Sequence, residues 1–193
     1  MGQSTASKIR ESGVAQAMRT ILEPIGMFDA ELDEIGAARA LAAQLIGPCI
    51  ADEETLKAIY LRSGYGVYVV REYGRVAGVL ALIFLNRAGL RAVEADTFDP
   101  LRPPIEMAVL PHEEPAAVYA WGIAAATREA AGILVSGSWA LGAAVPDQPF
   151  FVRAATAAGR RLLTEKMAFE PHPGSTTGLL WSGRRVGGRR EAA

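Results

Sequence analysis

The first third of the chain carries apolar residues three and four positions apart, which is the spacing of one helix face. Asp29 is suited to cap a helix that Gly47 and Pro48 bring to an end. Asp52 is suited to cap a further helix, with two acidic residues in its first turn, that ends near Gly64. The sequence therefore predicts two helices before the pattern changes.

From residue 66 the apolar pattern changes to that of strands, rich in Val, Ile and Leu. It predicts strands over residues 66–72 and 75–85, joined by a hairpin turn at Tyr73 and Gly74. The second strand is apolar on both faces, which is typical of a strand in the centre of a sheet.

The ends of this first half are less regular. Residues 14–22 fit a helix, with the alternative that they lead into a first strand at residues 19–24. Residues 90–97 and 105–110 are predicted as strands. Five prolines interrupt the remainder of residues 87–115, which is therefore predicted to form loops. These are Pro100, Pro103, Pro104, Pro111 and Pro115.

Beyond Pro115 the chain alternates strands and helices. The predicted elements are a strand at 118–126, a helix at 130–143, a strand at 150–154, a helix at 156–167 with Thr156 as its cap, and a last strand at 176–181. The first helix begins Glu129-Ala-Ala-Gly132-Ile-Leu134, and the second ends Thr164-Glu165-Lys166-Met167-Ala168-Phe169. This order, with the central glycine, the Glu-Lys pair and the phenylalanine in register, resembles the acyl-CoA core of the GNAT (N-acetyltransferase, acyl-CoA N-acyltransferase) superfamily.

The resemblance covers roughly residues 19–181 and is specific between residues 118 and 169. It implies an α/β (α+β) fold, with a GNAT-like mixed, mostly antiparallel twisted sheet flanked by helices. It also implies a single acyl-CoA N-acyltransferase domain over residues 19–183. A partly disordered N-terminal extension is expected over residues 1–18, and a flexible tail over residues 184–193.

The resemblance implies that acetyl-CoA or another acyl-CoA binds as co-substrate, without a metal. A helix N-terminus offers free N–H groups and a positive dipole end to the pyrophosphate. The pantetheine amides bind as if they were a further strand at a splayed sheet edge, and the strand end near residues 123–125 holds the thioester carbonyl. The implied acyl-CoA-binding residues are Ile123, Ala124, Ala125, Arg128, Ala130, Ala131, Gly132, Ile133, Leu134, Ala157 and Arg160.

Several positions depart from the family pattern. Glu129 replaces the usual Gln or Arg, and its carboxylate repels a pyrophosphate unless the side chain turns away. Leu134 replaces a small residue. Thr164 stands where the family often has the tyrosine that returns a proton to the departing CoA thiolate, and a threonine hydroxyl is a weaker acid. Thr164 is therefore either a hydrogen-bond donor to the leaving group or an ordinary helix surface residue.

A general base must then come from elsewhere in the chain. Glu106 is the candidate, because it interrupts an apolar stretch, and Glu94 and Asp96 are alternatives. Each of the three also fits the solvated face of a strand or loop. Tyr119 and Trp121 share one strand face, where they fit either an acceptor pocket or the core.

The function implied is transfer of an acetyl or other acyl group from acyl-CoA to an amine of an unknown acceptor. The alternative is a non-catalytic GNAT-fold protein that binds acyl-CoA, or another ligand, as a sensor or interaction module. The missing tyrosine and the altered turn favour the alternative.

Composition narrows the range of partners. Among 193 residues, Lys plus Arg number 20 and Asp plus Glu 21, so nucleic acid is not expected as a partner. The longest apolar run, residues 76–85, is too short to span a bilayer, and the polar N-terminus is unlike a signal peptide. A cytoplasmic protein without a membrane partner is therefore expected.

Cys49 is the single cysteine and is expected to be a buried structural thiol. His112 and His172 lack metal-site spacing.

One segment has an unusual lack of charge. Residues 130–145 contain no charged side chain. A helix without charge is usually covered on most of its sides. Either the N-terminal extension packs over this helix or a second subunit does, and the second possibility predicts a homodimer.

Overall fold

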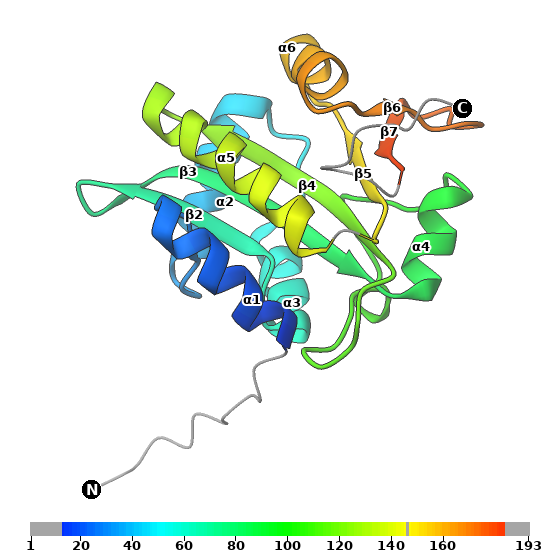
Figure 1. Ribbon diagram of the computed structural model, residues 1–193, viewed down its shortest axis with the longest axis horizontal. Helices are drawn as coiled ribbons and strands as arrows, with labels where there is room; N and C mark the ends of the chain where they lie inside the picture. Colours follow the sequence, from blue (N-terminus) through cyan, green and yellow to red (C-terminus); the bar gives the residue numbers. More distant parts are fainter. Residues whose placement is uncertain (1–12, 146, 184–193) are drawn as a thin grey trace, which may run out of the picture.

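The computed structural model describes residues 13–145 and 147–183, which form one seven-stranded sheet with helices on both faces (Figure 1). The strands are β1 (Phe28–Asp29), β2 (Val67–Glu72), β3 (Arg75–Leu85), β4 (Ala117–Ala125), β5 (Phe150–Arg153), β6 (Glu170–Pro171) and β7 (Leu179–Ser182). Their spatial order is β1-β2-β3-β4-β5-β7-β6. Every neighbouring pair is antiparallel except β4 and β5, which are parallel. The predicted fold class, a mixed and mostly antiparallel sheet flanked by helices, is confirmed.

The helices form two layers around this sheet. They are α1 (Gly13–Leu22), α2 (Glu34–Ile46), α3 (Glu53–Ser63), α4 (Arg87–Glu94), α5 (Arg128–Ala144) and α6 (Ala157–Arg161), with short 3-10 turns η1 (Glu23–Ile25) and η2 (Ile105–Met107) and a π-helical turn η3 (Leu162–Lys166). In Figure 1, α1 and α5 lie in front of the sheet and α2 and α3 behind it.

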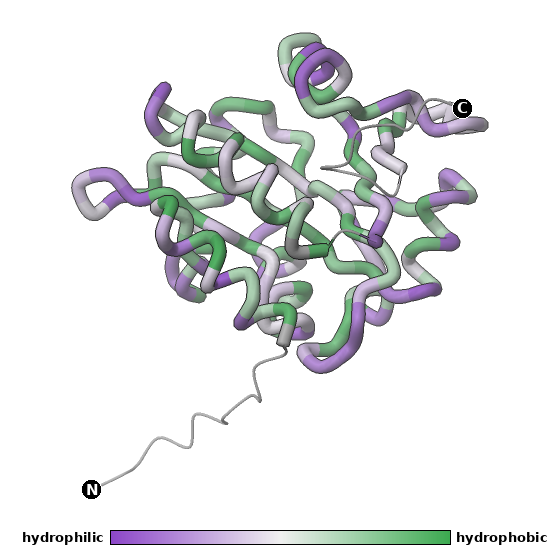
Figure 2. Tube along the Cα trace, in the orientation of Figure 1, coloured by the Kyte–Doolittle hydropathy of each residue, from purple (hydrophilic) through white to green (hydrophobic). Residues whose placement is uncertain are grey.

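The strand pattern explains why both layers form. In β2, Tyr68 and Val70 pack in the core beneath α1 and α5, whereas Val67 and Val69 pack in the core beneath α2. Strand β3 is buried along most of its length, as the two-faced apolar pattern predicts. The hairpin turn is confirmed at Tyr73 and Gly74, which both have positive φ, and it forms the hydrophilic tip at the left of Figure 2.

Two of the predicted helix caps are confirmed by hydrogen bonds. The Asp52 carboxylate accepts from the Thr55 N–H at 2.7 Å, and the Thr156 hydroxyl accepts from the Gly159 N–H at 3.0 Å. The helix predicted to begin at Asp29 begins instead at Glu34. Asp29 belongs to β1, because its backbone pairs with β2 and its carboxylate binds Arg19 at 2.7 Å.

The strands predicted at residues 90–97 and 105–110 are wrong. The first segment lies mostly in α4 and the second begins with η2. The cause is Asn86, whose side-chain oxygen accepts from the N–H groups of Ala88 and Gly89 at 3.0 and 3.1 Å and so begins the helix. Its amide also donates to the Glu106 carbonyl at 2.7 Å, which connects the two segments.

The last two predicted elements of the chain, a helix and a strand, are shorter than expected. The helix predicted over residues 156–167 is α6 followed by η3, in which the Met167 N–H donates to the Leu162 carbonyl, five residues earlier. The strand predicted at 176–181 is β7 (Leu179–Ser182), because the preceding residues form a loop that binds Asp96.

The N-terminal segment is helical and covers the uncharged helix. Residues 14–22 lie in α1, so the strand alternative at residues 19–24 is wrong. Ala15, Met18 and Leu22 of α1 lie in the same core cluster as Leu134 and Leu141 of α5. Of the two ways to cover α5, packing of the N-terminal segment is therefore present, and the homodimer stays a prediction. None of the described helices is both long and apolar enough to cross a bilayer.

Candidate functional site

Strands β4 and β5 lie side by side only at the start of β4. They pair in parallel from Val118 to Ala120, after which β5 ends at Arg153 while β4 continues to Ala125. A register shift against β3 leaves Trp121 without a counterpart, and such a bulge bends a strand at that point. The strand pairs of the described residues therefore leave an opening between the second half of β4 and the segment that follows β5.

A cavity of about 380 Å³ occupies this opening. Its walls come from β3, β4 and β5, from the C-terminal half of α5, and from α6 and η3. Most of the lining is apolar and includes Leu82, Ala120, Leu141, Val152, Leu163 and Phe169. A volume and lining of this kind are typical of a small-molecule pocket.

A smaller apolar pocket adjoins the cavity beneath α2. Its volume is about 40 Å³, and it shares Ile46, Ile50, Trp121 and Gly122, among others, with the larger cavity. The opening therefore continues past β4 toward the other face of the sheet. Such a continuation suits an elongated apolar group more than a compact polar one.

Among the described residues that line the cavity, Arg153 at the end of β5 is the one with a charged side chain. Its Nη2 donates to the Asp96 carboxylate at 3.2 Å. Its Nε is buried and has no hydrogen-bond partner among the described residues. A buried N–H without an acceptor costs free energy, and residues 13–145 and 147–183 supply none to this donor.

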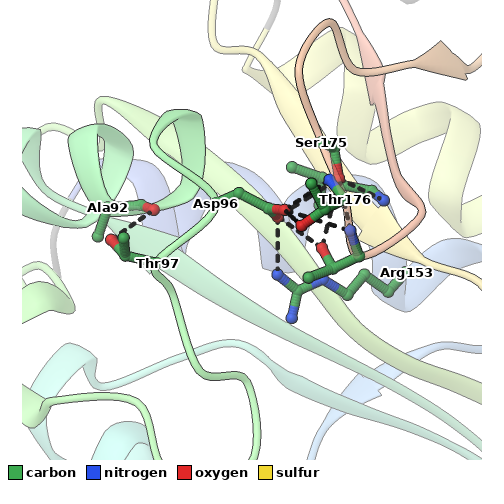
Figure 3. Close-up of polar contacts among 8 residues, drawn as sticks. Ala92, Asp96, Thr97, Arg153, Ser175 and Thr176 are labelled. Carbon is green, nitrogen blue, oxygen red and sulfur yellow. Dashed lines mark hydrogen bonds and ion pairs between the residues drawn. The ribbon is translucent and has the colours of Figure 1, made fainter.

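Asp96 fixes the position of the Arg153 guanidinium (Figure 3). Its carboxylate accepts from the Thr177 hydroxyl at 2.5 Å, from the Thr176 N–H at 2.8 Å and hydroxyl at 3.0 Å, and from the Ser175 hydroxyl at 3.3 Å. The Thr177 hydroxyl foremost, followed by the Thr176 N–H and hydroxyl and by Arg153, holds the pKa of Asp96 far below its usual range. Asp96 therefore stays ionised and ties the loop before β7 to the end of β5.

Two aromatic residues on one face of β4 line the cavity. Burial raises the pKa of Tyr119 to about 12, so its phenol stays protonated at neutral pH. The Tyr119 ring packs against Phe98, with ring centroids 5.1 Å apart. The Trp121 indole N–H donates to the Pro100 carbonyl at 2.6 Å, which fixes the neighbouring loop at the cavity wall.

Cys49 also lines the cavity, and the prediction of a buried thiol is wrong. Cys49 is exposed because the residues from Gly47 to Ile50 form the surface loop between α2 and α3. The thiol is thus reachable from solvent at the edge of the cavity. It supplies a natural reporter position, since the chain has a single cysteine.

The predicted strand-end residues divide between the two faces of β4. Ile123 lines the cavity and is partly exposed. Ala124 points to the opposite face, where it packs in the core beneath α2. Ala125 is the last residue of β4 and pairs with Gly78 of β3.

The predicted pyrophosphate site at the N-terminus of α5 is an acidic helix cap. The Thr127 hydroxyl accepts from the Ala130 N–H at 3.0 Å and donates to the Glu72 carboxylate at 2.6 Å. Glu129 and Arg128 are exposed on the first turn. A pyrophosphate at this helix end would meet two carboxylates and one guanidinium, so the local charge opposes its binding.

The other predicted residues of α5 and α6 lie outside the cavity lining. Ala130 and Leu134 are buried in the core, and Ile133 packs against it. Ala131 is half-buried, and a side chain at Gly132 would meet nothing within 4 Å. Ala157 and Arg160 are exposed on α6, whereas their neighbours Thr156 and Gly159 line the cavity.

The two predicted catalytic residues are also outside the cavity. The Thr164 hydroxyl donates to the Arg160 carbonyl at 3.0 Å within its own helix. Glu106 is exposed in η2, next to the end of β3 that pairs with the start of β4. The residues of β4 that line the cavity are Tyr119 to Ile123, whereas the end of β3 next to η2 pairs with Ala117 at the start of β4, and Glu106 is not among the lining residues. The structure does not bring Glu106 and Thr164 together.

Sequence reasoning missed Arg153 as a site residue. The available signal was an arginine at the end of the apolar run Phe150-Phe151-Val152, where a charge at a sheet position needs a partner. That partner is Asp96, which the sequence indicates only as a candidate base. Their 57-residue separation gives no local pattern that connects them.

Comparisons with known proteins add little to this geometry. No protein-family model matches the sequence, and no curated protein sequence matches it. One similar solved structure is the GphF GNAT-like decarboxylase in complex with isobutyryl-CoA. It is 15% identical, with 72% of this chain and 71% of that chain covered and a TM-score of 0.48.

Proposed function

We propose that this chain is a GNAT-like protein that binds an acyl thioester of CoA, with its acyl chain and pantetheine arm in the opening between β4 and β5. The observation that carries this proposal is the apolar cavity of about 380 Å³ where the parallel pair β4 and β5 separates. The order β4, α5, β5, α6 also supports it.

Each part of such a ligand has a matching surface. The pantetheine amides pair with the edge of β4 from Trp121 to Ala125, which the strand pairs leave open on the β5 side. The acyl chain lies against the apolar walls. Burial of one CH₂ group is worth about 0.8 kcal/mol, or about fourfold in Kd. The diphosphate contributes little, because Glu72 and Glu129 lie at the α5 N-terminus.

The chemistry of the cavity supports binding as a sensor or interaction module rather than acyl transfer. Transfer to an amine requires a group that takes a proton from the amine and one that protonates the thiolate. The described residues that line the cavity include no carboxylate and no histidine. Tyr119 is a poor acid there, because burial raises its pKa to about 12.

Calorimetry with the full chain tests the proposal. CoA, acetyl-CoA and octanoyl-CoA are titrated, and we expect octanoyl-CoA to bind most tightly because its chain buries the most apolar surface. Absence of heat and of any thermal shift at millimolar ligand would overturn the proposal. Thiol release is then followed with a panel of amines. We expect no release above spontaneous hydrolysis, and amine-dependent release would restore the acyltransferase hypothesis.

A further inference from the structure

The cavity contains one polar feature that an acyl chain alone does not explain. Arg153 is the charged residue in a mostly apolar lining, and its buried Nε has no acceptor among the described residues. Burial of a guanidinium N–H group without a hydrogen-bond acceptor costs free energy. The bound ligand is a natural source of the missing acceptor.

The fold determines where this guanidinium lies. Phe151 and Val152, which precede Arg153, are buried between β4 and β7, and Arg153 pairs with Leu179 of β7. On the far side, Asp96 binds Nη2 and is itself fixed by the loop that contains Ser175 (Figure 3). Arg153 is thus held by the sheet at its backbone and by Asp96 at its tip.

The hydrogen bonds of Asp96 leave most of the donors of Arg153 available. Asp96 accepts from the hydroxyls of Ser175, Thr176 and Thr177 and from two backbone N–H groups, in addition to one guanidinium nitrogen. Within the part of the chain that the structure describes, Nη2 is the one nitrogen of Arg153 that takes part in this network. A guanidinium has five N–H donors, so an oxygen in the cavity can be bound without breaking the contact with Asp96.

We propose that Arg153 binds the head of the acyl ligand, by donating from Nε to an oxygen on the first carbon of the acyl chain. This inference rests on the proposed function, because it requires an acyl chain in the cavity. The oxygen belongs either to a thioester carbonyl or to a free carboxylate, and both sources carry the same acceptor at the end of an apolar chain. Arg153 then sets which end of the chain lies at β5.

The test compares Arg153→Met and Arg153→Lys with the wild-type chain, and Arg91→Met, at an exposed position of α4, is the control. Octanoyl-CoA and sodium octanoate are titrated separately by calorimetry. We expect Arg153→Met to weaken binding of at least one of them by about 10- to 100-fold, the usual range for a hydrogen bond to a charged group. Loss with octanoyl-CoA identifies a thioester oxygen, and loss with octanoate identifies a carboxylate.

Two further measurements separate recognition from folding. Arg153→Lys retains a cation that can reach Asp96 but has no N–H at the Nε position, so we expect the same loss of affinity with a smaller change in Tm. With a ¹³C-labelled head carbon, the infrared band of the ligand's C=O or carboxylate should shift on binding to the wild-type chain and return toward its free position in Arg153→Lys.

The outcomes distinguish this inference from the function on which it rests. Binding of both ligands by Arg153→Met or Arg153→Lys with wild-type affinity, and with an unchanged infrared band, would overturn the assignment of Arg153 alone. Failure of the wild-type chain to bind either ligand would overturn the proposed function.

Discussion

The N-terminal turn of α5 and the opening between β4 and β5 are the two parts of this fold that an acyl-CoA would contact, and they differ in character. The turn is polar and acidic, with Thr127 bonded to Glu72 and with Glu129 exposed beside it. The opening is apolar and contains Arg153 as its charged lining residue. The difference shows that this strand order leaves an apolar opening in the sheet even though the charges at the helix N-terminus do not favour a diphosphate.

The largest expected effect comes from filling the opening. Ala120→Trp places an indole in the cavity, and we expect the affinity for octanoyl-CoA to fall by more than about 100-fold, because the chain loses its apolar contacts. Calorimetry measures the loss. Ala37→Trp, at an exposed position of α2, is the matched control, and Ser138→Phe fills the cavity from α5. Wild-type affinity in both filled variants would mean that the ligand binds elsewhere.

A second prediction concerns the length of the acyl chain. From acetyl-CoA to hexanoyl-CoA the affinity should rise by about fourfold for each CH₂ group, as long as each group is buried. A series of acyl-CoA titrations measures this slope. In Ala120→Trp the slope should vanish. A flat series in the wild-type chain would assign recognition to the CoA part and would reverse the comparison between the two regions.

A third prediction concerns the Asp96 network that supports the opening. Asp96→Asn removes the charged acceptor of the hydrogen bonds from Arg153 and the loop before β7, and we expect the Tm at neutral pH to fall below that of the wild-type chain. Thermal unfolding followed by circular dichroism measures the difference. The matched control is Asp33→Asn, at an exposed position before α2.

The pH dependence of that difference follows from the pKa of Asp96. Its pKa is lowered in the folded state, so its stabilisation is complete above the unfolded value of about 3.9 and is lost as pH falls toward the folded value. The Tm difference between wild type and Asp96→Asn should be constant above about pH 5 and should shrink below about pH 4. A difference that grows in acid would contradict this assignment.

The smallest expected effect is at the α5 turn. Glu72→Gln and Glu129→Gln each remove a carboxylate near the helix N-terminus, and we expect each to tighten octanoyl-CoA binding by about two- to fivefold at low salt. The gain should diminish at high salt because exposed charges are screened. Glu94→Gln, at an exposed position of α4, is the control. Weaker binding in either variant would show that these carboxylates support the ligand.

The sequence was sufficient to predict the main elements of the fold. The two-faced apolar pattern of residues 75–85 predicted the central strand, and Asp52 and Thr156 were correctly predicted as caps. The strands predicted at 90–97 and 105–110 failed because one local side-chain contact, at Asn86, outweighed the apolar pattern.

The candidate site was less accessible from sequence. Its Arg153–Asp96 contact joins residues 57 positions apart. The cavity lies where β5 ends and β4 has a bulge at Trp121, and no local sequence pattern marks either feature. The motif at residues 129–134 predicts a binding site at the N-terminus of the helix. The residues of α5 that line the cavity are Ser138, Leu141 and Gly142, which lie in its C-terminal half.

Alkylation of Cys49 tests most directly whether an acyl ligand occupies the opening. Cys49 is the single cysteine, is exposed, and lines the cavity, so its reaction rate reports on access to the edge of that space. With saturating octanoyl-CoA we predict that the rate of alkylation by a maleimide falls at least about tenfold, as expected when bound ligand leaves the thiol inaccessible for most of the time, and that it is unchanged by the ligand in Ala120→Trp. An unchanged rate in the wild-type chain, under conditions where calorimetry reports binding, would contradict the account.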